Sequence, residues 1–366
     1  MREGRGGEEI RHILPLAPRG CSALSDDPRL YYTAVFKMHI PPRGSGHLEE
    51  PRRLDRAVAA IKRSGLLGRL EKVEPGFGSL RVFEEVHDPL YIRGLLSELE
   101  ASLDSYFIDS DTYISPGTQA ALEALASAVE EASEHVVEGG KALVLGRPPG
   151  HHAGVAGPGL GAPSLGGSLV NAAAAIAYRL AKRGLKVLIV DFDANHGNGT
   201  QEILQALPMG ERIFHLDIHQ DWRKSFPWTG EPGVTGDGAA LNIVLPEGSG
   251  DDIMLALLEG LEPMIRDSAP DALVASMGFD GYTGDSPLTL TKLTANTYYS
   301  LGRLASGYPV AAVLETGFGR GLEQGLPAFV AGLLGLGNPA GEEATESSVE
   351  VWREFLELNK EVVEAG

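Results

Sequence analysis

Two aspartates stand two residues apart near the middle of the chain. Asp191 and Asp193 belong to the segment DFDANHGNGTQ (191–201), which directly follows the apolar run KVLIV. On extended backbone two such residues point the same way, although a turn at the end of a strand can redirect either one. Adjacent carboxylates repel each other and need a cation or a hydrogen-bond donor between them. The alternative interpretation is a pair of solvated loop aspartates.

Asp280 strengthens the metal interpretation. It follows the apolar run DALVASMGF (271–279) and therefore offers a third oxygen from a different strand. A metal with three protein ligands keeps one position for water, whose pKa falls towards ~7 so that hydroxide forms at neutral pH. Cys21 is the only cysteine, so an internal disulfide is excluded and a metal site must consist of histidines and carboxylates.

His151 and His152 are adjacent in the segment RPPGHHA (147–153). Adjacent histidines do not easily bind one metal together, but they can present two acid–base groups to one water molecule. A lone histidine is more often a core or surface residue without a chemical role. A pair in a loop stiffened by proline and glycine favours the functional interpretation.

Short apolar runs that alternate with longer helical patterns position these residues. The predicted strands are 141–146, 186–192, 212–218, 271–279 and 309–316. The predicted helices are 115–137 with Ser115 as its cap, 171–184, 251–267, 291–305 and 349–365. Strands that are apolar on both faces and separated by helices predict a three-layer α/β domain, with a mainly parallel central sheet and helices on both faces.

Polar segments follow all five predicted strands. They are RPPGHHA, DFDANHGNG, IHQD, GFDGY and ETGFGRG. Because open parallel sheets bind ligands beyond the carboxyl ends of their strands, we expect these segments to meet in one crevice. No repeat or linker divides the chain. We therefore predict a loosely ordered N-terminal extension over 1–28 and a single catalytic domain over 29–366.

The 366 residues carry a formal net charge of -19 at pH 7. This charge disfavours non-specific nucleic-acid binding and attracts cationic ligands such as lysine tails or polyamines, although it also serves solubility alone. The start of the chain lacks the pattern of a secretory signal, and glycine and proline break the longest uncharged segment, 154–178. We expect a cytoplasmic protein without a membrane span.

Four segments resemble, in order and spacing, signature segments of the histone deacetylase family, which includes acetoin-utilisation and acetylpolyamine deacetylases. They are RPPGHHA, DFDANHGNGTQ, SMGFDGY with the DSPL that follows it, and VLETGFGRG. Weaker similarities lie at 47–57, 109–118 and 219–230. The resemblance implies an arginase/deacetylase fold and a metal-dependent hydrolase that removes an acyl group from a lysine or polyamine-type amine.

The resemblance also implies an acid–base machinery. His152 would be the general base and His151 its partner. Asp191 would orient His151, and Asn198 would orient His152. Such outer contacts fix the tautomer and the basicity of each imidazole.

The metal ligands implied by the resemblance are Asp193, Asn195 and Asp280. The family has histidine where this chain has Asn195. His196 does not replace it, because on extended backbone the next residue points to the opposite face. The family metal is zinc; Mn or Fe is an alternative, since asparagine offers oxygen in place of nitrogen and an all-oxygen ligand set favours Mn, Mg or Ca relative to Zn.

Two further departures concern the substrate pocket. Phe318 stands where active members mostly carry a tyrosine whose hydroxyl donates to the developing oxyanion; loss of such a donor typically costs about 10²- to 10³-fold in rate. Gly167 replaces one of two aromatic tunnel walls, the other being Phe226. Asp111 would lie at the rim of this tunnel, where the family holds the substrate backbone. We expect a wider or reshaped pocket.

Two hypotheses about function follow. The first is a metal-dependent deacetylase acting on an acylated amine such as acetyl-lysine or an acetylpolyamine. The second is a catalytically silent homologue that keeps the pocket as an acyl-ligand binding or scaffold protein. Retention of both histidines and both aspartates favours the first, whereas the changes at Asn195 and Phe318 favour the second.

Overall fold

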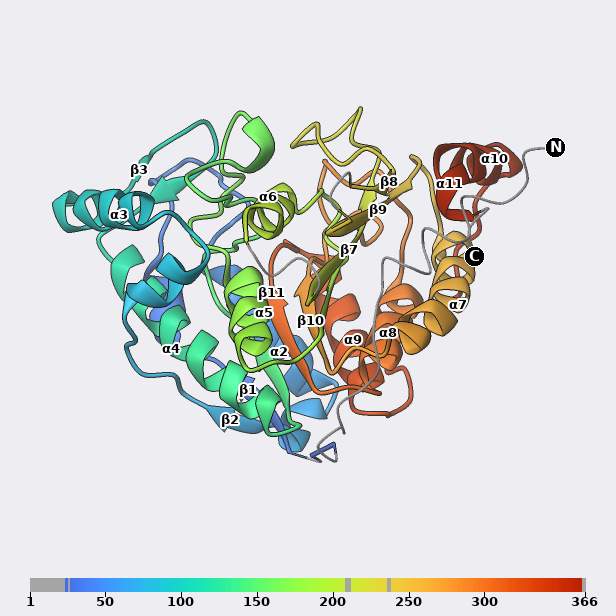
Figure 1. The fold of residues 1–366 in the computed structure, drawn as a ribbon, viewed down its shortest axis with the longest axis horizontal. Coiled ribbons are helices and arrows are strands. Elements are labelled where there is room, and N and C mark those ends of the chain that lie inside the picture. Colours follow the sequence, from blue (N-terminus) through green and yellow to red (C-terminus); the bar gives the residue numbers. More distant parts are fainter. Residues whose placement is uncertain (1–23, 26, 208–211, 236–237, 364–366) are drawn as a thin grey trace.

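The computed structural model describes residues 24–25, 27–207, 212–235 and 238–363. Its central sheet consists of β1 (Pro28–Tyr31), β2 (Glu71–Val73), β5 (Lys141–Val144), β6 (Val187–Asp191), β7 (Ile213–Gln220), β8 (Gly233–Val234), β9 (Ala240–Leu245), β10 (Ala272–Met277) and β11 (Val310–Leu314). The strand order is β2-β1-β5-β11-β10-β6-β7-β9-β8 (Figure 1). Neighbouring strands are parallel except β8 and β9, which are antiparallel. A separate antiparallel ribbon joins β3 (Tyr106–Phe107) to β4 (Tyr113–Ile114).

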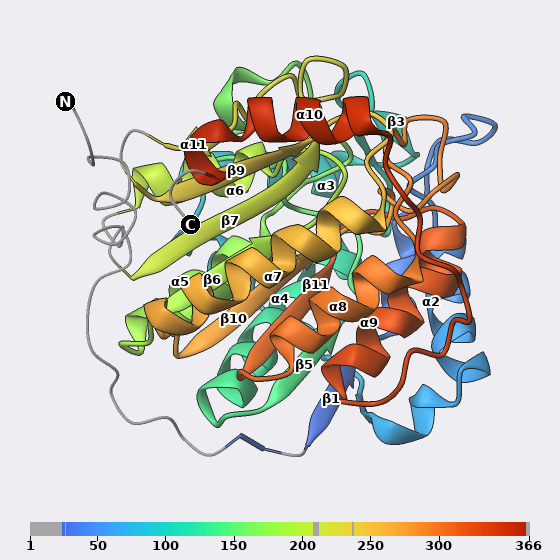
Figure 2. The same ribbon diagram turned by 90° about the vertical axis from the view of Figure 1, so that its right-hand side faces the viewer.

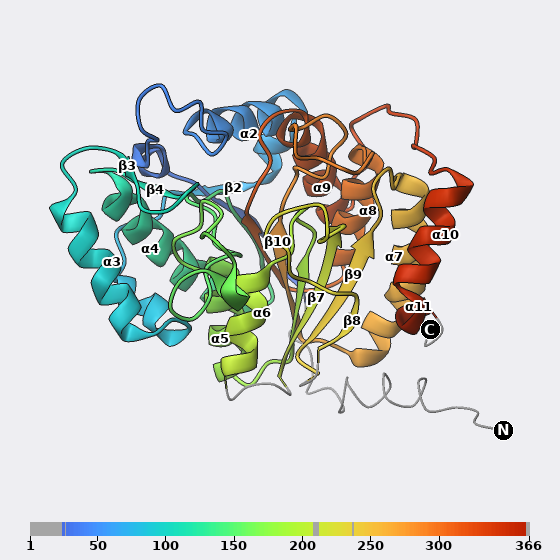
Figure 3. The same ribbon diagram turned by 90° about the horizontal axis from the view of Figure 1, so that it is seen from above.

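Helices cover both faces of this sheet (Figures 2 and 3). One face carries α3 (Pro89–Ala101), α4 (Thr118–Val137), α5 (Ala172–Lys182) and α6 (Asn198–Ala206). The other carries α2 (Arg52–Arg63), α7 (Asp251–Ser268), α8 (Ala295–Ala305), α9 (Leu326–Leu333), α10 (Val349–Leu358) and α11 (Lys360–Val363). Short helical turns are η1 (Ala34–Met38), η2 (Leu66–Arg69), η3 (Leu80–Glu85), η4 (Gly159–Gly161) and η5 (Gly321–Gly325). Within the described ranges, no helix is both long enough and apolar enough to span a membrane.

The predicted three-layer α/β architecture is confirmed. The five predicted strands are β5, β6, β7, β10 and β11, which form one continuous block of the sheet in the order β5-β11-β10-β6-β7. Because these strands are parallel, their carboxyl ends lie along the same edge, and the polar segments that follow them meet there. The sequence analysis did not predict β9, which lies between β7 and β8.

Helix α5 illustrates how local sequence defines an element next to the site. Its N-cap is Asn171, whose Oδ1 accepts a hydrogen bond from the Ala174 N–H (2.9 Å), and Gly184 with a φ of 92° follows its end. For helix α4, the observed N-cap differs from the predicted one. Ser115 donates to the Met38 carbonyl (3.1 Å), and the N-cap position belongs to Gly117.

The predicted N-terminal extension over 1–28 lies largely outside the described residues. Of this range, only residues 24, 25, 27 and 28 are described, and Pro28 is already the first residue of β1.

His87 ties the loop after His152 to the start of helix α5. Its Nδ1 donates to the Gly154 carbonyl (2.7 Å), and its Nε2 accepts from the Asn171 N–H (2.9 Å). Protonation of Nε2 would break the second bond. Burial lowers the pKa of His87 to about 4.

We therefore expect acid to destabilise the fold through His87. Between its folded pKa and its unfolded value of about 6.5, the unfolded chain binds more protons, so this contribution is complete above pH 6.5 and declines below it by about 1.4 kcal/mol per pH unit. Denaturant unfolding of wild type and His87→Gln at about pH 7.5 and about pH 5 measures the effect. The variant should lose less stability on acidification; equal losses would contradict the expectation.

Candidate active site

Two buried carboxylates lie side by side at the carboxyl ends of the adjacent strands β6 and β10. Asp193 Oδ2 accepts from the backbone N–H of Thr316 (3.3 Å) and from its hydroxyl. Asp280 Oδ1 accepts from the Ala194 N–H (3.1 Å). Burial, together with neighbouring Asp280, raises the pKa of Asp193 well above its usual range, and burial also raises the pKa of Asp280. Such a pair is stabilised by a bound cation or a shared proton.

His151 lies directly beside this pair. Its Nδ1 is 3.2 Å from Asp191 Oδ2, the contact that an orienting role requires, and its Nε2 is 3.8 Å from Asp193 Oδ1. This buried Nε2 has no hydrogen-bond partner. Burial alone would lower the pKa of His151, but Asp193 and Asp191 raise it well above its ordinary value. The Nε2 of His151 therefore faces the Asp193 carboxylate without forming a hydrogen bond to it.

His152 has the opposite character. Asn198 Nδ2 donates to the Gly159 carbonyl (2.6 Å), so Asn198 must turn its Oδ1 towards His152 Nδ1, at 2.7 Å. Nδ1 of His152 consequently carries the hydrogen, and Nε2 is the free acceptor. Burial and neighbouring His151 lower the pKa of His152 well below its ordinary value. A neutral imidazole with a free Nε2 is suited to accept a proton.

Asn195 presents a donor to the carboxylates. Its Nδ2 donates to Asp280 Oδ2 (3.3 Å), and its Oδ1 accepts from Gln220 Nε2 (3.3 Å). The metal-ligand role that the resemblance implies for Asn195 stays a prediction; in the structure its Oδ1 faces Gln220. His196 is engaged elsewhere, with Nδ1 2.9 Å from Thr229 Oγ1 and Nε2 3.0 Å from Gln201 Oε1.

A cavity of about 690 Å³ opens over these groups. Among its lining residues are His152, Asp111, Phe226 and Phe318. The rings of Phe226 and His152 meet edge to face, with centroids 4.8 Å apart. Residues from distant segments of the chain thus share one cavity with the candidate base.

Gly167 is not among the residues that line this cavity; its neighbour Gly166 is. A Cβ at Gly166 would lie 2.4 Å from His152 Cδ2 and 2.7 Å from Phe226 Cε1, so no side chain fits there. Gly167 instead donates its N–H to Thr112 Oγ1 (3.0 Å). The lost aromatic wall at Gly167 stays a prediction; in the structure, Gly166 is the glycine that borders the cavity.

The sequence analysis missed several lining residues. Gln220, Thr316, Glu49 and Trp228 all contribute to the cavity. All four stand in segments that already resembled the family, HLEEPRRLDRA, HQDWRKSFPWTG and VLETGFGRG, so the signal was present but the sequence analysis gave these residues no role. Trp228, 58% exposed, adds an aromatic ring at the mouth.

Asp285, in the DSPL segment, holds the loop that carries Phe318. Its carboxylate accepts the N–H groups of Phe318 (2.7 Å), Gly319 (2.8 Å) and Gly321 (2.7 Å). The Arg53 guanidinium lies 5.3 Å from the centre of the Phe318 ring. Asp285 thus holds the backbone of Phe318, and Arg53 packs on its ring, so the side chain has a fixed place at the cavity wall.

We expect Asp285→Ala to lower the free energy of unfolding by about 2 kcal/mol or more, because three backbone donors lose a charged acceptor. Denaturant unfolding of the purified variant measures this. Exposed Asp267 of α7 provides the control, since its replacement by alanine should change stability by no more than about 0.5 kcal/mol. Similar effects at the two positions would contradict the anchoring role of Asp285.

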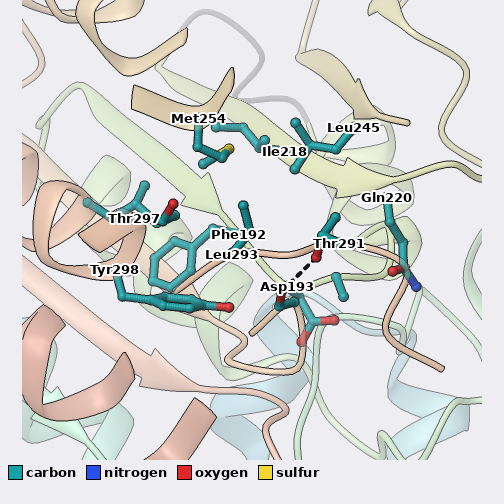
Figure 4. Close-up of a pocket in the computed structure, with 13 residues that line it drawn as sticks. Phe192, Asp193, Ile218, Gln220, Leu245, Met254, Thr291, Leu293, Thr297 and Tyr298 are labelled. Atoms are coloured by element: carbon teal, nitrogen blue, oxygen red, sulfur yellow. Dashed lines mark hydrogen bonds between the residues drawn. The ribbon is translucent and has the colours of Figure 1, made fainter. Parts of the chain in front are cut away.

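Asp191 also belongs to a second group of buried side chains, together with His215 and Asp217. Ligand atoms of Asp191, His215 and Asp217 all lie within 4.8 Å of one another, a spacing that suits a cation. Neither ring nitrogen of His215 has a hydrogen-bond partner. Figure 4 shows a separate, mainly apolar pocket beside Asp193, in which the Asp193 carboxylate points away from the side chain of Met254.

The architecture agrees with that of a known class of domain. The crystal structure of the HDA15 HD domain superposes with a TM-score of 0.78 at 25% sequence identity, covering 93% of this chain and 95% of that one. The sequence profile of the histone deacetylase domain matches residues 47–332. The chain belongs to the histone deacetylase family.

Curated relatives agree with this assignment. An uncharacterised protein of Methanocaldococcus jannaschii is 36% identical over 312 residues, covering 83% of this chain and 87% of that protein. The acetylpolyamine amidohydrolase of Mycoplana ramosa is 32% identical over 321 residues, covering 76% and 88%. A probable deacetylase of Methanothermobacter thermautotrophicus is 34% identical over 301 residues, covering 79% and 86%.

Proposed function

We propose that this protein is a metal-dependent amide hydrolase that removes an acyl group from a lysine or polyamine-type amine. Relatives named as deacetylases and amidohydrolases support a hydrolase of amide bonds. The observation that carries the proposal is the buried histidine pair at the edge of two buried carboxylates. Asn198 binds His152 Nδ1 and leaves its Nε2 free, and the pKa of His152 is lowered where that of His151 is raised. An acid–base pair of this kind is suited to activate water.

Asp193 and Asp280 would hold the metal. Both carboxylates are buried and both have raised pKa values, as expected for a pair that needs a cation between its members. Bound there, a divalent metal would polarise the substrate carbonyl and lower the pKa of water. The family resemblance favours Zn, whereas oxygen ligands favour Mn, and Fe is a further candidate.

The chain's own residues would divide the reaction as follows. His152 Nε2 takes a proton from water as the water oxygen bonds to the acyl carbon; Asn198 keeps the hydrogen on Nδ1, so that Nε2 remains the acceptor. When the C–N bond breaks, a proton is returned to the leaving amine, and the products are a carboxylate and the free amine. Phe226 flanks His152, and Asp111 lies where a cationic substrate would enter.

A second candidate function is acyl-ligand binding without turnover. Two observations favour it: the Asn195 NH₂ group, rather than an oxygen, faces Asp280, and Phe318 has no hydroxyl to donate. In this case the cavity would hold an acylated amine and release it unchanged.

Reporter hydrolysis separates the two functions. The purified protein is stripped of metal, reloaded with Zn, Mn or Fe, and assayed on acetyl-lysine and trifluoroacetyl-lysine reporters. The trifluoroacetyl group makes the carbonyl more electrophilic and so partly offsets the lack of an oxyanion donor at Phe318. We expect turnover with at least one metal. Binding of a reporter without hydrolysis under all three conditions would establish the binding function instead.

A further inference from the structure

Backbone groups fix both the oxygen and the nitrogen of the Gln220 side-chain amide. Gln220 ends strand β7 and is 1% exposed. Its Oε1 accepts from the Leu290 N–H (2.9 Å), and its Nε2 donates to the Leu288 carbonyl (3.2 Å). A backbone N–H can only donate and a carbonyl can only accept, so turning this amide over would lose both bonds.

The orientation of Gln220 determines that of Asn195. Gln220 Nε2 also donates to Asn195 Oδ1 (3.3 Å), which leaves Asn195 Nδ2 to face Asp280 Oδ2 (3.3 Å). In the opposite orientation, the two NH₂ groups would face each other and the Asn195 oxygen would face the Asp280 carboxylate. Each of these contacts is repulsive without a cation.

Gln220 and Asn195 line the same cavity as Asp280. An NH₂ group directed at a cation site repels the cation and supplies no lone pair to it. The NH₂ group also stabilises the negative charge of Asp280, which a metal would otherwise neutralise.

We propose that Gln220 is a positioning residue that holds Asn195 as a hydrogen-bond donor to Asp280 and thereby weakens binding of divalent cations at the site. The inference rests on the proposed metal site at Asp193 and Asp280. Asn195 becomes a ligand only when its amide turns over, and Gln220 opposes that change.

The test is the Mn²⁺ affinity of Gln220→Glu, measured by calorimetry on the full chain. A glutamate still accepts the Leu290 N–H and accepts from Asn195 as well, so the Asn195 amide can turn its oxygen towards the cation. We expect binding at least about tenfold tighter than in wild type. Gln220→Met, of similar length and without charge, frees the Asn195 amide and should tighten binding by a smaller factor.

Asn195→Ala supplies the matched control. The added charge of Gln220→Glu acts on a cation with or without Asn195, whereas the proposed effect requires Asn195. Asn195→Ala alone should not weaken Mn²⁺ binding and should tighten it by less than Gln220→Glu does, because a donor that competes for Asp280 is lost and no ligand is gained. Thermal unfolding followed by circular dichroism verifies that each variant is folded.

The proposal stands if most of the gain from Gln220→Glu disappears in the Asn195→Ala background. An equal gain in both backgrounds, or no gain in either glutamine variant, overturns it. A large loss of affinity in Asn195→Ala also overturns it, because Asn195 would then be a ligand in wild type. These affinity results are independent of reporter hydrolysis, which alone decides the proposed enzymatic function.

Discussion

Phe318→Tyr is expected to raise the turnover of an acetyl-lysine reporter by about 10²- to 10³-fold, the usual contribution of one oxyanion donor. The ring already lines the cavity, and Asp285 and Arg53 hold its loop and its face, so a hydroxyl would be added to a fixed side chain. Steady-state kinetics with saturating metal measures the gain. Most of it should appear in kcat, since the donor acts on charge that develops during the reaction.

Phe226→Tyr is the matched control for this prediction. It adds the same hydroxyl to a second phenylalanine of the cavity, whose ring meets His152 edge to face. We expect no comparable gain there. Combining Phe318→Tyr with Asn195→His should raise turnover further, because histidine supplies the nitrogen ligand of the family. If Phe318→Tyr leaves kcat unchanged while metal is bound, the missing hydroxyl is not what limits the enzyme.

His152→Ala is expected to lower kcat by about 10²- to 10⁴-fold without loss of bound metal, since it removes the general base and no metal ligand. The pKa of His152 is held well below its ordinary value by burial and by His151. The base therefore stays unprotonated through neutral pH, and protonation of His152 should not slow wild type between about pH 8 and about pH 6.5. Kinetics over this range, with metal content measured alongside, tests both statements.

His196→Gln is the control for the loss of a buried imidazole. Its two ring nitrogens lie against Thr229 and Gln201, so it should affect turnover far less than His152→Ala. A comparable loss in both variants would indicate a general structural effect of removing histidine. A pH profile of wild type that falls steeply below pH 8 would contradict the assignment of His152 as the low-pKa base.

Much of the fold follows from the sequence because its central strands are apolar on both faces. All five residues of β6 are buried, as are all five of β11, and such runs stand out against the helical patterns around them. Strand β9 is equally buried, but Asn242 interrupts its apolar pattern. Its Nδ2 donates to Gln201 Oε1 (3.0 Å), a tertiary contact that periodicity alone does not reveal.

The sequence predicts which residues meet at the strand ends, but it does not predict how their atoms are hydrogen-bonded. Strand ends place Asp193 and Asp280 together whatever the details of the loops. Which atom of Asn195 faces Asp280 depends on Gln220, and the orientation of Gln220 depends on backbone groups of Leu288 and Leu290. These partners are far apart in the sequence, and no local pattern encodes their hydrogen-bond directions.

The sequence also does not settle which of two adjacent glycines borders the cavity. Sequence comparison with the family assigned the missing aromatic wall to Gly167, whereas Gly166 borders the cavity between His152 and Phe226. Both glycines have a positive φ, 57° for Gly166 and 79° for Gly167. Two consecutive residues in this region turn the chain in a way that a strand or helix pattern does not predict.

The measurement that tests the central claim most directly is the hydrolysis of trifluoroacetyl-lysine by metal-loaded wild type and Asp280→Ala, with bound metal determined in the same samples. We predict that wild type binds a divalent metal and releases trifluoroacetate, and that Asp280→Ala loses both properties. Wild type without metal or turnover would contradict the proposed enzyme. Unchanged turnover in Asp280→Ala would place the reaction elsewhere than at the Asp193–Asp280 pair.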